Sequence, residues 1–397
     1  MAPTRLASPR PRGGIGRIVL GAAVAAAALL LSGCTEPPKV ETFWSPDGKT
    51  IAYLAGDGPF GGDALFLYDV KAKTSAKLAT GAGAAFSPRW SPDGKVIAFY
   101  SASGNEDAMS VPMSVNAVDL ATGQMEVLQA QRWPKPVAAS PPSAAAPEET
   151  VRGLALVFGQ PASWSPDGRR LACIGPDPAG TAIVLLSYPS GTAAPIVQTS
   201  GTIGWLAWSP DGNKIAYVWF PRPEPEHYWA SSLWLHDLAT STTTKIADLE
   251  EGSPVEGTSI VWSADSTRIG FIGRGPGHRL TFPEVQGAAD IHWAGRETAC
   301  LVDARPGATV TTAIEDITEL AAWAPGLVGV AFAEFNWEAD PPEDAVLVYR
   351  GLQPPVRKVL GVLPGVRGPS QSSVPEFSAD GRRVSVAVGR VLVFAGP

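Results

Sequence analysis

One pentapeptide recurs along this chain and limits what the chain can fold into. The motif Trp-Ser-Pro-Asp-Gly occurs in four complete copies, and weaker copies begin at Trp262 and Phe377. Serine at the first turn position, proline at the second and glycine at the fourth suit a type I β-turn followed by a glycine with positive φ. The aspartate is then most simply a side chain that caps the turn. The complete copies begin at Trp44, Trp90, Trp164 and Trp208.

The residues after each turn alternate with period two, as those of a half-buried strand do. Large residues such as Ile51 and Tyr53 stand seven and nine positions after the aromatic residue, and a small residue such as Ala52 stands between them. The small face therefore lies against a close neighbour, such as another sheet. We expect each aromatic anchor to pack against that sheet, so its replacement by alanine costs about 3–5 kcal/mol.

A third and a fourth strand follow in each unit. Third strands are predicted at 64–69, 114–119, 182–187, 232–237, 345–349 and 390–394. Units of four antiparallel strands, spaced by 46 and 44 residues in the clearest cases, describe the blades of a β-propeller. The 42 glycines and 38 prolines agree with a turn-rich all-β chain. The predicted fold class is therefore an all-β propeller of four-stranded antiparallel blades over residues 43–397.

The number of blades depends on two further tryptophans. Trp293 and Trp323 stand where degenerate anchors fall, and counting both gives eight blades, which the sequence favours. If one of the two precedes an internal strand instead, the ring has seven blades. The complete set of predicted anchors is Trp44, Trp90, Trp164, Trp208, Trp262, Trp293, Trp323 and Phe377.

These motifs resemble the WD40-like (PD40) repeats of TolB-type β-propellers, which also occur in the propellers of prolyl-oligopeptidase relatives. The resemblance covers residue 40 to the C-terminus and implies a fold more specifically than an activity. TolB-type proteins carry an α/β domain before the propeller, whereas the first repeat here begins ten residues after Cys34.

The first 33 residues have the form of a lipoprotein signal peptide. They hold four arginines and no acid, and the apolar run 18–31 is too short to span a bilayer as a helix. Leu31-Ser-Gly-Cys34 resembles the lipobox of bacterial lipoproteins, which implies that Cys34 is acylated and anchors the protein to membrane lipid on the exported side of the envelope. The residue after the cysteine is Thr35 and not aspartate, which in bacteria with two membranes resembles the signal that sorts a lipoprotein to the outer membrane. Residues 34–42 are predicted to form the lipidated N-terminus and a strand that closes the ring.

The mature chain is acidic. Without the arginines of the leader, 38 Asp and Glu exceed 27 Lys and Arg, so the body offers no basic surface for nucleic acid. Cys173 and Cys300 are both predicted on second strands of separate blades, which favours buried free thiols over a disulfide.

Long irregular connections are expected at one end of the ring and short turns at the other, because successive strands are antiparallel. The long-loop end is the predicted binding face. Residues 129–153 are predicted to be a flexible insertion rich in proline and alanine. The candidate binding residues are Trp219, Phe220, Arg222, His227, Tyr228 and Trp229, which suit sugar rings or protein partners. The alternative, an aromatic loop packed on the rim of the propeller itself, stays open.

The sequence contains no recognisable catalytic motif, and its four histidines lack metal-ligand spacing. We therefore predict no catalytic residue, metal or cofactor. The favoured function is a monomeric, membrane-anchored scaffold that binds an envelope protein or a cell-wall component. Two alternatives remain: a propeller enzyme acting on a glycan or small molecule, such as a lyase or glycosidase, and a sensor of sugars or other small ligands.

Overall fold

The computed structural model describes residues 42–55, 64–78, 84–102, 110–134, 162–177, 180–221, 231–249, 260–274, 297–317, 320–336, 343–368, 373–388 and 391–397. The chain divides into two compact units after Pro37, and every strand within these described ranges belongs to the second unit. In the ranges just given, no helix has the length and apolar character needed to cross a membrane. The predicted signal peptide and Cys34 lie outside these ranges.

Seven antiparallel sheets follow one another along the chain, and each pairs its strands in sequence order. Blade 1 contains β1 (Thr42–Trp44), β2 (Thr50–Ala55), β3 (Ala64–Asp69) and β4 (Thr74–Lys77); blade 2 contains β5 (Ala84–Trp90), β6 (Val96–Ala102), β7 (Ser110–Asp119) and β8 (Met125–Pro134). Blade 3 contains β9 (Ala162–Trp164), β10 (Arg170–Asp177), β11 (Gly180–Ser187) and β12 (Ala193–Thr199); blade 4 contains β13 (Thr202–Trp208), β14 (Lys214–Phe220), β15 (Ser232–Asp237) and β16 (Thr242–Asp248). Blade 5 contains β17 (Val261–Trp262), β18 (Arg268–Arg274), β19 (Glu297–Asp303) and β20 (Thr311–Ile317). Blade 6 contains β21 (Ala321–Trp323), the 3₁₀ turn η1 (Pro325–Leu327), β22 (Gly329–Glu334), β23 (Val346–Leu352) and β24 (Pro355–Val362); blade 7 contains β25 (Glu376–Phe377), β26 (Arg383–Ala387) and β27 (Val391–Ala395).

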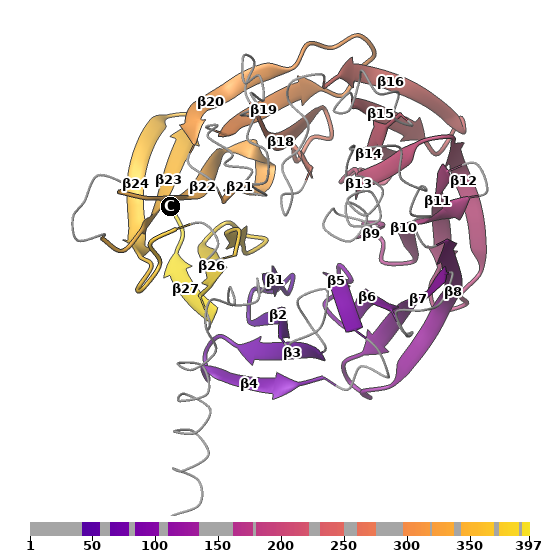
Figure 1. Ribbon diagram of the computed structural model, residues 1–397, viewed down its shortest axis with the longest axis horizontal. Helices are drawn as coiled ribbons and strands as arrows, with labels where there is room; N and C mark the ends of the chain where they lie inside the picture. Colours follow the sequence, from indigo (N-terminus) through magenta and orange to yellow (C-terminus); the bar gives the residue numbers. More distant parts are fainter. Residues whose placement is uncertain are drawn as a thin grey trace, which may run out of the picture. The chain divides into compact units, whose positions relative to one another are not determined.

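The sheets are arranged as a ring, with the first strand of each blade innermost and the fourth strand outermost (Figure 1). The predicted propeller is confirmed, and of the two predicted blade counts, seven is the one observed. In every blade the first strand ends at an aromatic anchor: Trp44, Trp90, Trp164, Trp208, Trp262, Trp323 and Phe377.

The strand that follows Trp293 in the sequence does not belong to a separate blade. This strand, β19, pairs with β18 from Arg268↔Asp303 to Arg274↔Glu297, so β19 is the third strand of the Trp262 blade. Cys300 accordingly lies on a third strand and not on the predicted second strand. The local alternation after Trp293 fits a second or a third strand equally well, and only the pairing partner distinguishes them. Trp293 itself lies outside the described residues.

The first residues of the predicted flexible insertion form part of a strand. Residues 129–134 continue β8, which pairs with β7 as far as Ser110↔Pro134. The polar and proline-containing composition of this stretch shows no strand periodicity, and only its pairing with β7 identifies it as a strand. Residues 135–153 lie outside the described part of the chain.

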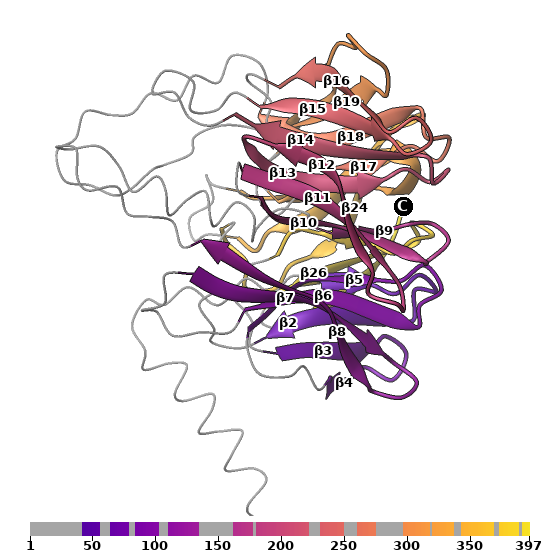
Figure 2. The same ribbon diagram turned by 90° about the vertical axis from the view of Figure 1, so that its right-hand side faces the viewer.

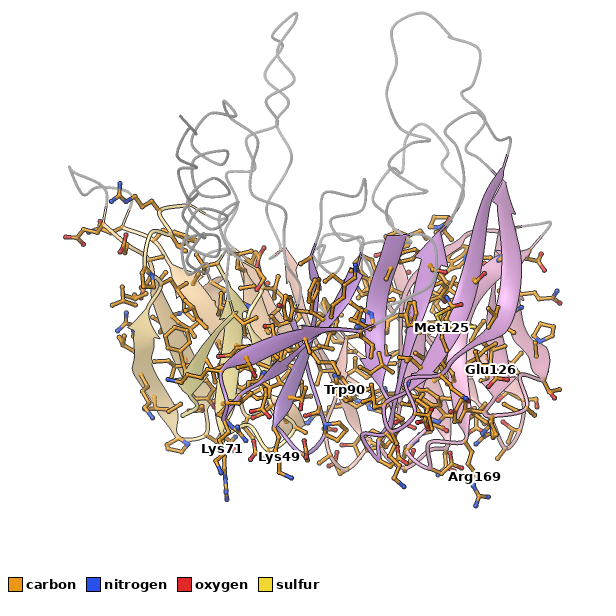
Figure 3. All side chains as sticks on the ribbon, turned by 90° about the horizontal axis from the view of Figure 1, so that it is seen from below. Lys49, Lys71, Trp90, Met125, Glu126 and Arg169 are labelled. Carbon is orange, nitrogen blue, oxygen red and sulfur yellow. The ribbon has the colours of Figure 1, made fainter. Side chains whose placement is uncertain are left out.

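The two ends of the ring differ in their connections. We call the end that carries the turns between first and second strands, and between third and fourth strands, the turn end, and the opposite end the loop end. Figure 2 shows the tight hairpins of successive blades along one side of the ring. Lys49 and Arg169 from first-to-second turns and Lys71 from a third-to-fourth turn all lie at the turn end (Figure 3).

The core lies between neighbouring blades. The residue seven positions after the anchor is fully buried in every blade: Ile51, Ile97, Leu171, Ile215, Ile269, Val330 and Val384. The small residue that follows faces the next blade, as the alternation predicts. In blade 5 it is Gly270, where an added Cβ would lie 2.5 Å from Leu327 Cδ2 and 3.0 Å from the ring of Trp323, both in blade 6.

The ring closes between its last and first blades. Trp44 Nε1 donates to the Glu376 carbonyl oxygen at 3.0 Å, and the hydroxyl oxygens of Thr42 and Ser385 lie 2.9 Å apart. Blade 7 has three strands within the described residues. Thr42 belongs to β1 and pairs with Tyr53, so it is no part of the predicted closing strand; residues 34–41 lie outside the described ranges.

Candidate functional site

The recurrent serine and aspartate form one hydrogen-bond network in six turns at the turn end. In blade 1, Ser45 Oγ donates to Asp47 Oδ1 at 2.8 Å and accepts the backbone N–H of Thr50 at 3.0 Å. Asp47 Oδ1 also accepts the N–H of Lys49. The serine-to-aspartate bond recurs at 2.5–2.7 Å in the turns that begin at Ser91, Ser165, Ser209, Ser263 and Ser378.

These hydrogen bonds favour the ionised carboxylates. The N–H of Lys49, the Lys49 ammonium and the Ser45 hydroxyl lower the pKa of Asp47 from 3.8 to about 2. Ser263 and Thr267 lower the pKa of Asp265 to about 2 in the same way. The recurrent aspartates are therefore turn caps, as the motif predicts, and these low pKa values have a structural cause.

The anchors join neighbouring blades by a second repeated contact. Trp90 Nε1 donates to the Phe43 carbonyl oxygen at 3.0 Å, so the indole reaches the residue just before the anchor of the preceding blade. The same contact links Trp164 to Arg89, Trp262 to Ala207 and Trp44 to Glu376. The indole nitrogens of Trp208 and Trp323 are buried without a hydrogen-bond partner in the described structure.

Arginines cover two anchors from the preceding blade. The guanidinium carbon of Arg383 lies 5.2 Å from the ring centroid of Trp44, and that of Arg170 lies 5.0 Å from the ring centroid of Trp208. Both arginines come from the residue before the buried aliphatic position, so each stabilises the seam to the next blade by a cation–π contact. These arginines hold the frame rather than a ligand.

The innermost strand of each blade carries one residue directly before its anchor: Phe43, Arg89, Ser163, Ala207, Val261, Ala322 and Glu376. Glu376 is the one carboxylate in this set, and Arg89 is the one cation. The guanidinium of Arg89 lies over the Phe43 ring at 4.9 Å.

The predicted aromatic binding segment is described only at its start. Trp219 and Phe220 end β14 at the loop end and are half-buried. Trp219 Nε1 donates to Thr199 Oγ1 at 3.1 Å, and its ring meets Trp234 edge-on at 6.3 Å. Phe220 packs on Trp205 at 5.8 Å. These two residues contact the propeller itself. The other candidates, Arg222, His227, Tyr228 and Trp229, lie outside the described residues.

The cysteines are buried free thiols, as predicted. Burial raises the pKa of Cys173 to about 12 and also raises that of Cys300. His236 is buried, and its Nδ1 lies 2.9 Å from Thr243 Oγ1. The described residues contain no group of three His, Cys, Asp or Glu side chains placed to hold a metal ion.

Together these features define the class of protein: a seven-bladed β-propeller built from WD40-like repeats with a repeated Ser-x-Asp turn. No protein-family model matches the sequence, and no curated protein matches it.

Solved structures nevertheless resemble it. Hydrazine synthase of Kuenenia stuttgartiensis has a TM-score of 0.58 at 14% identity, over 92% of this chain and 97% of that one. An oligogalacturonate lyase in complex with manganese has a TM-score of 0.54 at 15% identity, over 91% and 92%. TolB from Acinetobacter baumannii has a TM-score of 0.45 at 13% identity, over 90% and 72%. At such identities the likeness concerns the fold alone.

Proposed function

We propose that this chain is a lipid-anchored, non-catalytic scaffold of the bacterial envelope whose propeller binds a protein or cell-wall partner through its loop end. The anchor is Cys34, at the end of the Leu31-Ser-Gly-Cys34 motif. β1 begins at Thr42, so the ring starts eight residues after the lipid.

One observation carries the scaffold role: the residues that recur most in this sequence all stabilise the frame. Four of the anchor tryptophans donate across the seams between blades, and the serines and aspartates close the turns. Recognition then belongs to the connections that differ from blade to blade, and these lie at the loop end.

The anchor is tested by metabolic labelling with a fatty-acid analogue. The wild-type protein incorporates the label and stays with membranes, whereas Cys34→Ser loses the label and its membrane association. Cys173→Ala is the matched control, because its thiol is buried in the propeller, and it keeps the label. Absence of label from the wild-type protein contradicts the proposal.

The binding end is tested by crosslinking in the native envelope. The triple variant His227→Ala, Tyr228→Ala, Trp229→Ala loses the crosslinked partner, while Lys95→Ala at the turn end retains it. Trp219 is unsuitable for this test because its indole bonds to Thr199. Equal crosslinking by both variants, with unchanged unfolding midpoints, rules out recognition by this segment.

A further inference from the structure

The seam between blades 7 and 1 differs from the other six seams. Within the described residues, a cluster of buried apolar side chains joins the facing sheets at each of the other six seams, and no such cluster contains residues of both blade 7 and blade 1. The hydrogen bonds and the cation–π contact described above for this seam involve only β1, β25 and β26. The outer half of the seam, beside the third strands, thus lacks the apolar packing that the other seams have.

Blade 1 presents two stacked aromatic rings to this outer half. One face of blade 1, with Ala52 and Leu65, packs in the cluster shared with blade 2. Tyr53 and Phe66 are cross-strand partners on the other face, so they face blade 7, and their rings stack at 5.3 Å. Tyr53 stands nine positions after its anchor and is half-buried. The residue at this position is buried in each of the other six blades: Phe99, Cys173, Tyr217, Phe271, Phe332 and Val386.

Blade 7 presents an open strand edge to the same space. β27 is the outermost strand of its sheet within the described residues, whereas a fourth strand covers the third strand in every other blade. Gly396 N donates to the Arg382 oxygen. Antiparallel alternation therefore directs the N–H and C=O groups of Val391 and Val393 away from β26. An unpaired edge of this kind is a template for another strand.

The valine side chains of β27 line the seam. Val393 is the cross-strand partner of Ser385, whose hydroxyl contacts Thr42 of blade 1, so Val393 and Val391 lie on the face toward blade 1. Both are half-buried. Leu65 is the counterpart of Val391 in blade 1, where it is fully buried and its oxygen accepts the N–H of the residue after β4 at 2.8 Å. A fourth strand accounts for this difference.

Lysines stand on both sides of the open edge. Figure 1 shows β24 and β4 on either side of β27. Lys77 on β4 pairs with Phe66 and so faces blade 7. Lys358 on β24 pairs with Tyr349, on the face toward blade 7, and its Nζ donates to the Gly396 oxygen at 3.2 Å. The strands β24, β27 and β4 contain no aspartate or glutamate. The space is thus apolar between the sheets and basic at its sides, which favours an occupant with acidic residues.

The other blades show which side chains a strand at this position carries. In blades 2, 4 and 6 the fourth strand has a bulge opposite the third strand, and the extra residue is aliphatic: Leu128, Ile246 and Leu360. These three side chains belong to the clusters between blades. In blade 5, β20 combines apolar and acidic residues, and its Ile314 pairs with Ala299, the counterpart of Val391.

We propose that the open edge of blade 7 binds an extended segment of a partner protein, which adds to β27 as an antiparallel fourth strand. An aliphatic side chain of this segment covers the stacked rings of Tyr53 and Phe66. Its acidic residues lie beside Lys77 and Lys358. This surface is separate from the loop end and from the lipid anchor, so the inference goes beyond the proposed function.

The segment before β1 suits this position less well. It contains the adjacent prolines Pro37 and Pro38. Successive residues of a strand direct their nitrogens to opposite edges, so one of two adjacent prolines always places a nitrogen without hydrogen toward the neighbouring strand. A partner strand has no such restriction.

β20 supplies the probe for a binding test. A fluorescent peptide with the sequence of Thr311–Ile317 carries an aliphatic residue and two acids. We expect saturable binding of this peptide to the full chain, measured by fluorescence anisotropy. The same peptide with Glu315→Lys and Asp316→Lys should bind severalfold more weakly, because Lys77 and Lys358 repel it.

Two variants of the protein locate the binding. Val393→Pro removes an N–H that points away from β26, so the sheet keeps its own hydrogen bonds, and we expect binding about tenfold weaker. Lys77→Glu is an exposed substitution that leaves the strand intact. It should weaken binding of the acidic peptide and strengthen binding of the lysine peptide, whereas Lys245→Glu on the fourth strand of blade 4 changes neither.

The remaining outcomes overturn the proposal. Absence of saturable binding, both to the wild-type chain and to a chain in which residues 35–41 are replaced by glycine and serine, rules out the site. Binding that appears only after this replacement identifies the segment before β1 as the occupant. A dimer in sedimentation that Val393→Pro dissociates identifies a second copy as the occupant. Each of the last two results excludes a partner protein at this edge and leaves the proposed recognition at the loop end untouched.

Discussion

Two kinds of turn join the first and second strands of these blades, and they reach the same result by different chemistry. In six blades, a serine and an aspartate close a type I turn through their side chains. In blade 6, Pro325 is followed by Gly326 with φ 74°, which is a type II turn that needs no side-chain cap. The same backbone hydrogen bond closes both kinds of turn. It joins Ala324 N to the Gly329 oxygen in blade 6 and Ser45 N to the Thr50 oxygen in blade 1, at 2.8 Å in each case.

The difference teaches that blade geometry comes from strand pairing and from packing between blades, and that the Ser-x-Asp network stabilises each turn locally. In blade 6, Leu327 occupies the place of the motif glycine and is buried, where it meets Gly270 of blade 5. In blade 5, Ser266 replaces the glycine, has φ 57°, and accepts the N–H of Asp211 from blade 4 at 3.1 Å. Each departure from the motif is offset by a contact with the preceding blade.

The largest expected effect comes from filling the space beside Leu327. Gly270→Ala destabilises the fold by about 1–3 kcal/mol, because the new methyl group would collide with Leu327 and crowd the ring of Trp323. Leu327→Gly removes the first collision, so the double variant should be more stable than the sum of the single effects predicts. Chemical denaturation of the four proteins measures this coupling, and strictly additive effects contradict it.

Removal of a turn serine comes next. Ser91→Ala leaves the buried N–H of Val96 without the acceptor it has at 3.0 Å and removes a donor from Asp93. We expect a loss of about 1–2 kcal/mol in the free energy of unfolding. Ala324→Ser is the matched variant in blade 6, where no aspartate is present in the turn, and we expect it to change stability by less than about 0.5 kcal/mol. A similar effect at both positions shows that the network has no local role.

A smaller difference separates two buried anchors. Trp262→Phe loses the hydrogen bond from its indole to the Ala207 carbonyl oxygen at 3.1 Å, whereas the indole nitrogen of Trp323 has no partner in the described structure. Trp262→Phe and Trp323→Phe remove the same side-chain volume. Trp262→Phe should therefore lower the free energy of unfolding by about 1 kcal/mol more than Trp323→Phe does. Blade 7 already has Phe377 at this position. Equal losses, measured by thermal unfolding of both variants, contradict this assignment of hydrogen bonds.

Low pH should weaken the six turns that an aspartate caps and leave the turn of blade 6, which has no aspartate, unaffected. The pKa of Asp47 in the folded protein is about 2, below its ordinary value of 3.8, because the carboxylate accepts hydrogen bonds. The ionised group therefore stabilises the fold above the unfolded-state pKa, and this contribution is lost as the pH falls from 3.8 through 2. The unfolding midpoint should fall over that range, and it should fall less in Asp47→Asn. If the unfolding midpoint of Asp47→Asn depends on pH as that of the wild type does, protonation of Asp47 does not contribute to the loss of stability in acid.

Much of the fold is predictable because its signals are local. The turn motif and the alternation after it lie within ten residues of each anchor, and both are properties of a single hairpin. Six of the seven third strands were predicted close to their observed places for the same reason. The blade count was not determined, because the residues after Trp293 alternate as any strand does and only pairing with β18 identifies β19 as a third strand.

The candidate site was predictable only in part. Trp219 stands out in sequence as an aromatic residue beside a proline-rich segment, but its bond to Thr199 joins residues of two blades and leaves no local signal. The bonds that four anchor indoles make to the preceding blade also escape sequence reasoning, because the acceptor is a backbone carbonyl group that any residue supplies.

The sequence by itself determined the repeating unit: a hairpin turn, two alternating strands, and an aromatic anchor before each turn. Periodicity and turn chemistry are properties of neighbouring residues, and they act before the chain is assembled. Only the tertiary structure decided how many units form the ring, which indoles find acceptors, and why Gly270 stands where other blades have alanine or serine. Those outcomes depend on contacts between blades, and the residues that make them are separated by dozens of positions along the chain.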